Sequence, residues 1–279
     1  METHPVGYAS NIARVETWEC DFNGHWNTRF YTRAFQEASE TVALLDGRGS
    51  PGAASMRARH IRFHRELRTG DPVLVRSAAI QDGRWQGAVV HWLESDGVLS
   101  ATALDLPGVD ASGRASRHLP RVSEAAVAQA LPRGLPHEAP LARAATAGGR
   151  RASLGILRPA SYDHTGALMF DELFRYIGCA TYDFHVSLGY SPQFLARTGI
   201  SRMVVEMRVN WLGQAPAGAL KENSRGSISA MVKPLTGQAN FSEKVMRSGV
   251  GASGCADLPL TPLGCAESPS PARGEGKEG

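Results

Sequence analysis

Hydrophobic residues recur at spacings of three and four between Arg29 and Gly47, which is the period of a helix with one buried face. The members of this face are Phe30, Ala34, Ala38, Val42 and Leu45. Asn27 or Thr28 can cap the start of such a helix, and Gly47 can end it. The pattern therefore predicts one long amphipathic helix near the start of the chain.

Alternating hydrophobic and polar residues predict β-strands on both sides of this helix. One strand is expected before the helix, over residues 14–18. Four more are expected after it, over residues 58–67, 71–81, 84–95 and 98–107. Turns that contain Gly and Asp separate them, as in an antiparallel meander. This order predicts an α+β unit in which a curved antiparallel sheet wraps a long helix.

A weaker copy of the same pattern begins at His164. A shift of 139 residues places His164 on His25. The same shift places Ala160 where the first copy has Asp21. Further on, residues 207–211 (MRVNW) resemble residues 61–65 (IRFHR). These matches predict a second, partly eroded copy of the unit.

The repeat fails after Lys221, so the second unit is expected to be incomplete and to lack strands that the first one has. The segment between the two units is rich in Ala, Arg, Pro and Gly and predicts a connector with a short helix at residues 123–131. The predicted organisation is a first unit over residues 1–107, a connector over 108–151, a second unit over 152–246 and a disordered tail over 247–279.

Composition and charge exclude several classes of protein. The formal charge is +3 over 279 residues, and no basic run is interleaved with aromatic residues, which argues against a nucleic-acid partner. The chain opens without a signal-peptide pattern, and no apolar run approaches the roughly 20 residues of a membrane helix. Its four cysteines form no C-x-x-C pair and no zinc spacing with histidine. We expect a cytoplasmic protein with reduced thiols, no bound metal and no membrane partner.

Six polar or reactive side chains are crowded into residues 19–27, just before the predicted helix. Asp21 lies near the helix start, which offers free N–H groups and the positive end of the helix dipole. A carboxylate beside such amides suits attack on a carbonyl, because it activates water or attacks directly while an N–H polarises the oxygen. The alternative is that Asp21 only caps a turn.

The neighbours of Asp21 have simpler interpretations as well. His25 either takes part in the chemistry or only orders the loop by hydrogen bonds, and Asn23 suits a turn. If the strand continues, Glu19 shares a face with Asp21 and Cys20 lies on the other, which argues against a Cys–His nucleophile pair. The chain has no G-x-S-x-G elbow, no P-loop and no dinucleotide fingerprint, so serine hydrolysis and nucleotide chemistry are disfavoured.

The stretch ECDFNGHWNTRFYTRAFQEAS resembles the hotdog-fold acyl-CoA thioesterases of the 4-hydroxybenzoyl-CoA thioesterase type. HIRFHRELRTGDPVLV resembles the strand pair that follows in that family, with its G-D turn. The resemblance covers residues 15–106 well and residues 155–220 weakly, so the whole chain resembles a tandem, double hotdog. It implies hydrolysis of an acyl-CoA to free acid and CoA, with no cofactor apart from the CoA of the substrate.

Carried over by position, the resemblance makes Asp21 the catalytic carboxylate and gives His25 a place beside it. The amides near Asn27 and Thr28 match the helix end that polarises the thioester carbonyl. Trp26 replaces a small aliphatic residue, which narrows the acyl pocket. The expected substrate contacts are Gly24, Trp26, Asn27, Thr28 and Tyr31.

The second unit is then expected to form the opposite wall of a single working site built around Asp21. Arg62, Arg65 or Arg68 could meet the phosphates of CoA. Hotdog helices usually face a partner unit, so the resemblance also implies a homodimer of the chain.

Two other functions remain open. The stretch DFNGH is a near-match to the D-x-N-P-x-H of hotdog hydratases and dehydratases, but Asp21 and His25 are one residue too close and the proline is missing. The eroded second unit also leaves room for a non-catalytic acyl-CoA binder. The sequence does not fix the acyl group.

Overall fold

The computed structural model describes residues 7–21, 23–47, 56–107, 118–133, 151–211, 217, 220–224, 229–232 and 235–247. The strands are β1 (Tyr8–Arg14), β2 (Met56–Phe63), β3 (Pro72–Ile80), β4 (Val89–Ser95), β5 (Val98–Pro107), β6 (Arg121–Val122), β7 (Arg151–Ile156), β8 (Ile200–Trp211), β9 (Leu220–Ser224), β10 (Ser229–Val232) and β11 (Leu235–Arg247). The α-helices are α1 (Thr28–Leu45), α2 (Phe170–Ser187) and α3 (Pro192–Thr198), and the 3-10 helices are η1 (Thr17–Glu19), η3 (Glu124–Ala130) and η5 (Pro159–Ser161).

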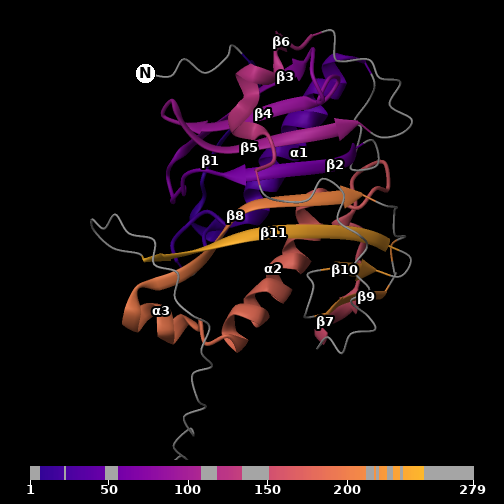
Figure 1. Cartoon of the computed structure of the whole chain (residues 1–279). Helices are drawn as coiled ribbons and strands as arrows, with labels where there is room; N and C mark the ends of the chain where they lie inside the picture. Colours follow the sequence, from indigo (N-terminus) through magenta and orange to yellow (C-terminus); the bar gives the residue numbers. More distant parts are fainter. Residues whose placement is uncertain are drawn as a thin grey trace, which may run out of the picture.

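The described strands form one eleven-stranded sheet in the order β1-β3-β4-β5-β2-β8-β11-β10-β9-β7 (Figure 1), with β6 added in parallel beside β3. All other neighbours along this path are antiparallel. We call the elements from β1 to η3 the first unit and those from β7 to β11 the second unit. The two units meet at the β2–β8 pair, where Ile61 lies opposite Met207.

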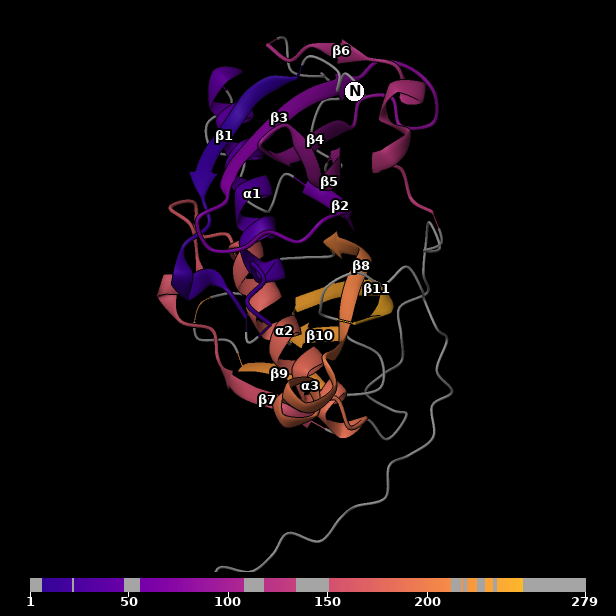
Figure 2. The ribbon, with the colours of Figure 1, turned by 90° about the vertical axis from the view of Figure 1, so that its left-hand side faces the viewer.

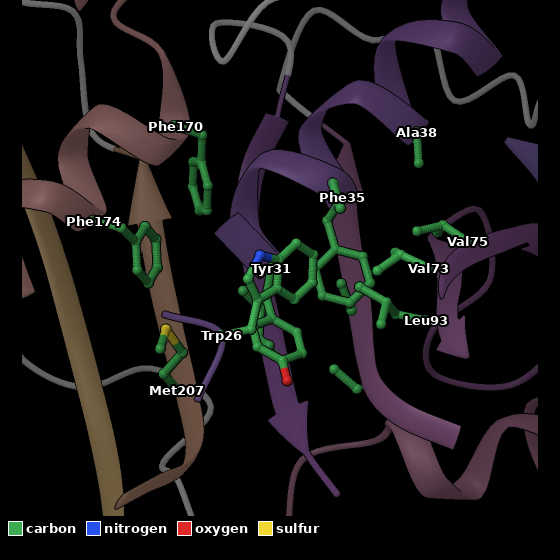
Figure 3. Packing of buried hydrophobic residues seen from close by; sticks show 14 of the residues in the cluster. Trp26, Tyr31, Phe35, Ala38, Val73, Val75, Leu93, Phe170, Phe174 and Met207 are labelled. Atoms are coloured by element: carbon green, nitrogen blue, oxygen red, sulfur yellow. The ribbon is translucent and has the colours of Figure 1, made fainter. Parts of the chain in front are cut away.

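Each unit packs one long helix on the sheet, and the two helices contact each other across the seam (Figure 2). One hydrophobic core joins the units, because Phe35 and Ile61 of the first belong to the same buried cluster as Phe170, Phe174 and Met207 of the second (Figure 3). At the helix contact, Arg29 of α1 pairs with Glu172 of α2 at 2.5 Å and with Asp171 at 3.2 Å. The seam is therefore a continuous interior.

The opposite face of the first unit's sheet is covered by η3. Val127 and Ala130 of η3 are fully buried against a cluster that includes Val90, Trp92 and Leu104. Ser123 caps this helix by accepting a hydrogen bond from the Ala126 N–H at 3.3 Å. The short helix predicted at residues 123–131 is confirmed, and it packs against the first unit.

The α+β prediction, with a long helix against an antiparallel sheet, is confirmed. Helix α1 buries Ala34, Ala38 and Val42 of the predicted face, whereas Phe30 is half-buried and Leu45 is exposed. The predicted strands at 58–67, 71–81, 84–95 and 98–107 correspond to β2 to β5. The strand predicted at residues 14–18 is wrong: β1 ends at Arg14, and η1 occupies residues 17–19. Most of β1 is exposed and shows no regular alternation of buried residues, so the hydrophobic pattern could not reveal it.

The second unit has the strand order β7-β9-β10-β11-β8, which repeats the order β1-β3-β4-β5-β2 of the first. The expectation that it lacks strands is therefore wrong. Two of its strands are shorter instead, since β9 and β10 have 5 and 4 residues whereas their counterparts β3 and β4 have 9 and 7. Strands this short offer too little alternation to be recognised from sequence.

The disordered tail predicted from residue 247 lies outside the described residues, except for Arg247 at the end of β11. Within the described part of the chain, no helix combines the length and the apolar character needed to cross a membrane.

Candidate functional site

Asp21 forms a tight turn just before α1. Its Oδ1 accepts hydrogen bonds from the backbone N–H of Asn23 at 2.8 Å and of His25 at 3.3 Å. Its own N–H donates to the His25 carbonyl at 2.8 Å. Gly24 completes the turn with φ of 73°, a conformation that favours glycine. Among the described residues Oδ2 has no hydrogen-bond partner, so one carboxylate oxygen holds the turn and the other is open to chemistry.

Helix α1 begins directly after this turn. The Asn27 side chain caps it by accepting a hydrogen bond from the Arg29 N–H at 3.0 Å. The Asn27 N–H donates a hydrogen bond to the Glu19 carbonyl at 2.9 Å, so it is not available to bind a substrate oxygen. In the described chain no acceptor meets the Thr28 N–H, which leaves it as the open amide of the helix start.

Aromatic residues fix the turn to the loop between β2 and β3. The Trp26 N–H donates to the Leu67 carbonyl at 2.7 Å, and the Leu67 N–H donates to the Tyr31 hydroxyl at 3.0 Å. Trp26 also donates from Nε1 to Glu19 at 2.8 Å. Burial raises the pKa of Tyr31, so its hydroxyl stays neutral. Leu67 is fully buried, and it therefore fixes the position of the neighbouring Glu66.

His25 is buried, and its Nε2 lies between two charged groups. The Glu66 carboxylate is 2.7 Å from Nε2, and a guanidinium nitrogen of Arg68 is 3.1 Å from it. A carboxylate favours a proton on Nε2, whereas a guanidinium can only donate and favours a bare nitrogen. Nε2 is thus the ring nitrogen that faces both charged groups.

A cavity of about 1030 Å³ lies beside the turn and extends across the seam. The first unit contributes Trp18, Asp21, Asn23, residues 25–31 and 63–66, Arg68 and Asp71. The second unit contributes Phe174, Arg175, residues 177–179, Thr181, Tyr182, Val204, Val205 and Met207. The volume is at the upper end of the roughly 300–1,000 Å³ typical of small-molecule pockets. Polar groups thus converge at one part of a large, partly apolar cavity.

The structure brings together most of the residues expected at the site. Those that line the cavity are Asp21, His25, Trp26, Asn27, Thr28 and Tyr31. Gly24 is not among them and serves the turn. Trp26 and Tyr31 line the cavity but are almost fully buried, because most of each side chain packs in the hydrophobic core.

Three further expectations concern charged and reactive neighbours. Arg65 and Arg68 line the cavity, but Arg62 does not, because its guanidinium donates to the carbonyls of Ala128 and Leu131 at 3.1 and 3.0 Å. Glu19 does not share a strand face with Asp21, since it lies in η1. Cys20 is not a lining residue.

Glu66 is the site residue that sequence reasoning missed. It follows β2 in a run of charged residues that reads as solvated surface. Glu66 comes close to His25 only because of how the loop after β2 folds. The one hint in the local sequence that this loop is partly buried is the apolar Leu67 next to Glu66. The second unit does contribute the opposite wall, as expected, but its lining residues on α2 and β8 could not be named from sequence, because they depend on how the units pack.

The second unit contains the same turn at a spacing of 142 residues. Asp163 Oδ1 accepts hydrogen bonds from the N–H groups of Thr165 at 2.8 Å and Ala167 at 3.0 Å, and Gly166 has φ of 79°. The helices begin at Thr28 and Phe170, which gives the same spacing (170 minus 28).

The predicted shift of 139 residues is therefore wrong. Asp163, not Ala160, corresponds to Asp21, and the match of His164 to His25 is a coincidence of identity. Ala167 stands in place of His25 and Met169 in place of the cap Asn27. The second unit has kept the turn and its acid but not the histidine.

Residues 15–131 match the thioesterase-like superfamily. The matched range begins directly after β1 and ends directly after η3, so it includes the Asp21 turn, helix α1 and strands β2 to β6. No curated protein matches the chain in a sequence comparison.

Solved structures share the fold over both units. A protein from Lactobacillus plantarum described as an oleoyl thioesterase has a TM-score of 0.57 at 14% identity, covering 87% of this chain and 97% of its own. An acyl-ACP thioesterase from Bacteroides thetaiotaomicron has a TM-score of 0.54 at 10% identity, covering 84% and 96%. The 12:0-ACP thioesterase of Umbellularia californica has a TM-score of 0.51 at 10% identity, covering 85% and 96%. The chain has the hotdog fold, and its match to the thioesterase-like superfamily lies in the first unit.

Proposed function

We propose that the chain hydrolyses an acyl thioester to a free acid and a thiol, with acyl-CoA as substrate. The observation that carries this proposal is the Asp21 turn: an acid with one open oxygen precedes the open Thr28 amide, and both residues line one large cavity. The fold, shared with thioesterases, and the family match of the first unit support the same reaction class.

In the proposed reaction, the thioester carbonyl oxygen accepts a hydrogen bond from the Thr28 N–H. Asp21 takes a proton from a water molecule as the water oxygen attacks the carbonyl carbon, or it attacks that carbon itself. The carbon–sulfur bond then breaks, and the thiolate leaves and takes up a proton. If Asp21 attacks, water hydrolyses the resulting anhydride in a second step.

His25 and Glu66 form a second acid–base pair in this proposal. The 2.7 Å contact between them allows the imidazole to hold a proton for the departing thiolate. The turn also keeps the alternative of a hydratase or dehydratase open, because it brings Asp21 and His25 close together. The missing proline and the short spacing argue for hydrolysis.

The tandem arrangement is also part of the proposal. We take the second unit as a hotdog copy that has lost its own histidine and forms the opposite wall of the site. Two proteins of similar fold act on acyl-ACP, as their names state, so an acyl carrier protein is the competing carrier for CoA. Arg65 and Arg68 line the cavity and are suited to meet the phosphate that both carriers share. A homodimer of the tandem chain stays a prediction.

A panel of acyl-CoAs and matched acyl carrier proteins tests the function. Release of free thiol, followed with a thiol reagent, is the expected result. Gain or loss of an acyl-chain double bond without thiol release would favour the hydratase alternative. Binding of acyl-CoA without turnover would leave a non-catalytic binder.

His25→Ala separates the two roles of the histidine. If His25 only orders the loop, the variant should lose less activity than Asp21→Asn. An equal loss, together with an equal loss in Glu66→Gln, would favour a paired acid–base role.

A further inference from the structure

The two units line the cavity with different chemistry. The first unit supplies the titratable groups next to the turn, among them Asp21, His25 and Glu66. The second unit supplies an apolar surface that includes the buried Phe174, Ile177 and Met207, with the polar Arg175 and Thr181 beside it. An acyl group that extends from a thioester at the turn across the seam would meet this apolar surface.

Gly178 is an unusual residue on this wall. It lies in the interior of α2, where glycine makes a helix less stable than alanine does. It is exposed and lines the cavity. A Cβ built at this position meets no atom within 4 Å, so neither close packing against another element nor a positive φ requires a glycine here. The one consequence of the missing side chain is free space on the cavity side of the helix.

The open space at Gly178 lies between the side chains of Phe174 and Tyr182 on α2, and we call this row of three residues the track. Phe174 and Tyr182 precede and follow it by four residues, so all three lie on one helix face, and all three line the cavity. Phe174 is buried at one end, whereas Tyr182 is 40% exposed at the other. Without a side chain at Gly178, the track is open between the two rings.

We infer that Gly178 sets the length of acyl chain that the enzyme accepts, and that the substrate carries an elongated alkyl group lying along α2 over this glycine. The inference rests on the proposed function. It assigns the second unit the task of binding the acyl group, while the first unit carries out the reaction.

The test is a series of Gly178→Ala, Gly178→Val and Gly178→Phe, assayed on acyl-CoAs from acetyl to hexadecanoyl. Each larger side chain should lower kcat/KM for the longest acyl groups, by at least about tenfold for Phe, and leave acetyl-CoA nearly unchanged. Gly178→Ala should also raise Tm, because it improves helix propensity. The Ala and Val variants keep the test valid if the Phe variant fails to fold.

Val186→Phe is the matched control, since Val186 is exposed on the same helix but does not line the cavity. It should keep the wild-type dependence on chain length. An unchanged chain-length profile in folded Gly178→Val and Gly178→Phe would overturn the inference while leaving thioester hydrolysis intact. A wild-type protein that releases no thiol from any acyl-CoA or acyl carrier protein would instead overturn the proposed function, and this inference with it.

Discussion

Asp21 and Asp163 make the same backbone hydrogen bonds, but only Asp21 lines the cavity. The sequence predicts the first of these acids from its place before a helix. It cannot predict Glu66, because the contact between Glu66 and His25 joins residues 41 positions apart (66 minus 25) through a loop. Residue types near a helix start thus indicate chemistry, whereas the partners that tune it depend on tertiary structure.

A buried ion pair under α1 gives a residue-scale prediction on stability. Arg59 is fully buried and bonds both oxygens of Asp105 at 2.6 Å. Burial alone would raise the pKa of Asp105, but Arg59 and His91 together hold it well below its usual value. Asp105→Asn leaves Arg59 charged and unpaired, and should lower the free energy of unfolding by about 3–5 kcal/mol in urea titrations at pH 7.

The pH dependence of this loss follows from the direction of the shift. A carboxyl group whose pKa is lowered on folding contributes stability above its unfolded pKa of about 3.9 and loses it as the pH falls towards the folded pKa. The gap between wild type and Asp105→Asn should therefore narrow below about pH 4. A gap that stays constant down to pH 3 would show that the charge of Asp105 contributes nothing.

At the scale of elements, helix α1 is predictable because its apolar period persists from Phe30 to Val42 and its cap is local. Strand β1 is not, since its alternation is absent. In the second unit, a chance match of histidines shifts the predicted register by three residues. The hydrogen-bonded turn, with its glycine in a left-handed conformation, is the better marker of equivalence between the units. The turn is a backbone feature, and its only trace in the sequence is the pattern D-x-x-G.

The start of α1 gives an element-scale prediction. Asn27→Ala removes the acceptor of the Arg29 N–H and should lower the free energy of unfolding by about 0.5–2 kcal/mol. It should also lower kcat, because the Thr28 amide belongs to the same helix end. Thermal unfolding and thiol-release assays measure the two effects.

Asn27→Ser is the control, because serine also caps helices. It should recover most of the stability and of kcat. If Asn27→Ala is less stable but keeps full activity, the start of α1 does not contribute to the reaction.

For the whole molecule, the shared core predicts that the two units unfold together. Met207 of β8 is 1% exposed and lies opposite Ile61 of β2 in the core that spans the seam. Met207→Ala should cost about 2–5 kcal/mol. Far-UV circular dichroism and tryptophan fluorescence should still report one coincident transition. Two separated transitions in the wild-type protein would contradict a continuous interior.

In the proposed function, one acid of two equivalent turns carries out thioester hydrolysis. The most direct test is the kcat for acyl-CoA hydrolysis of Asp21→Asn beside that of Asp163→Asn. Asparagine keeps the acceptor oxygen of the turn, so both variants should fold. We predict that Asp21→Asn loses about 10²–10⁴-fold in kcat while Asp163→Asn stays within about twofold of wild type. Equal activity in the two variants would contradict the assignment of Asp21 as the catalytic acid.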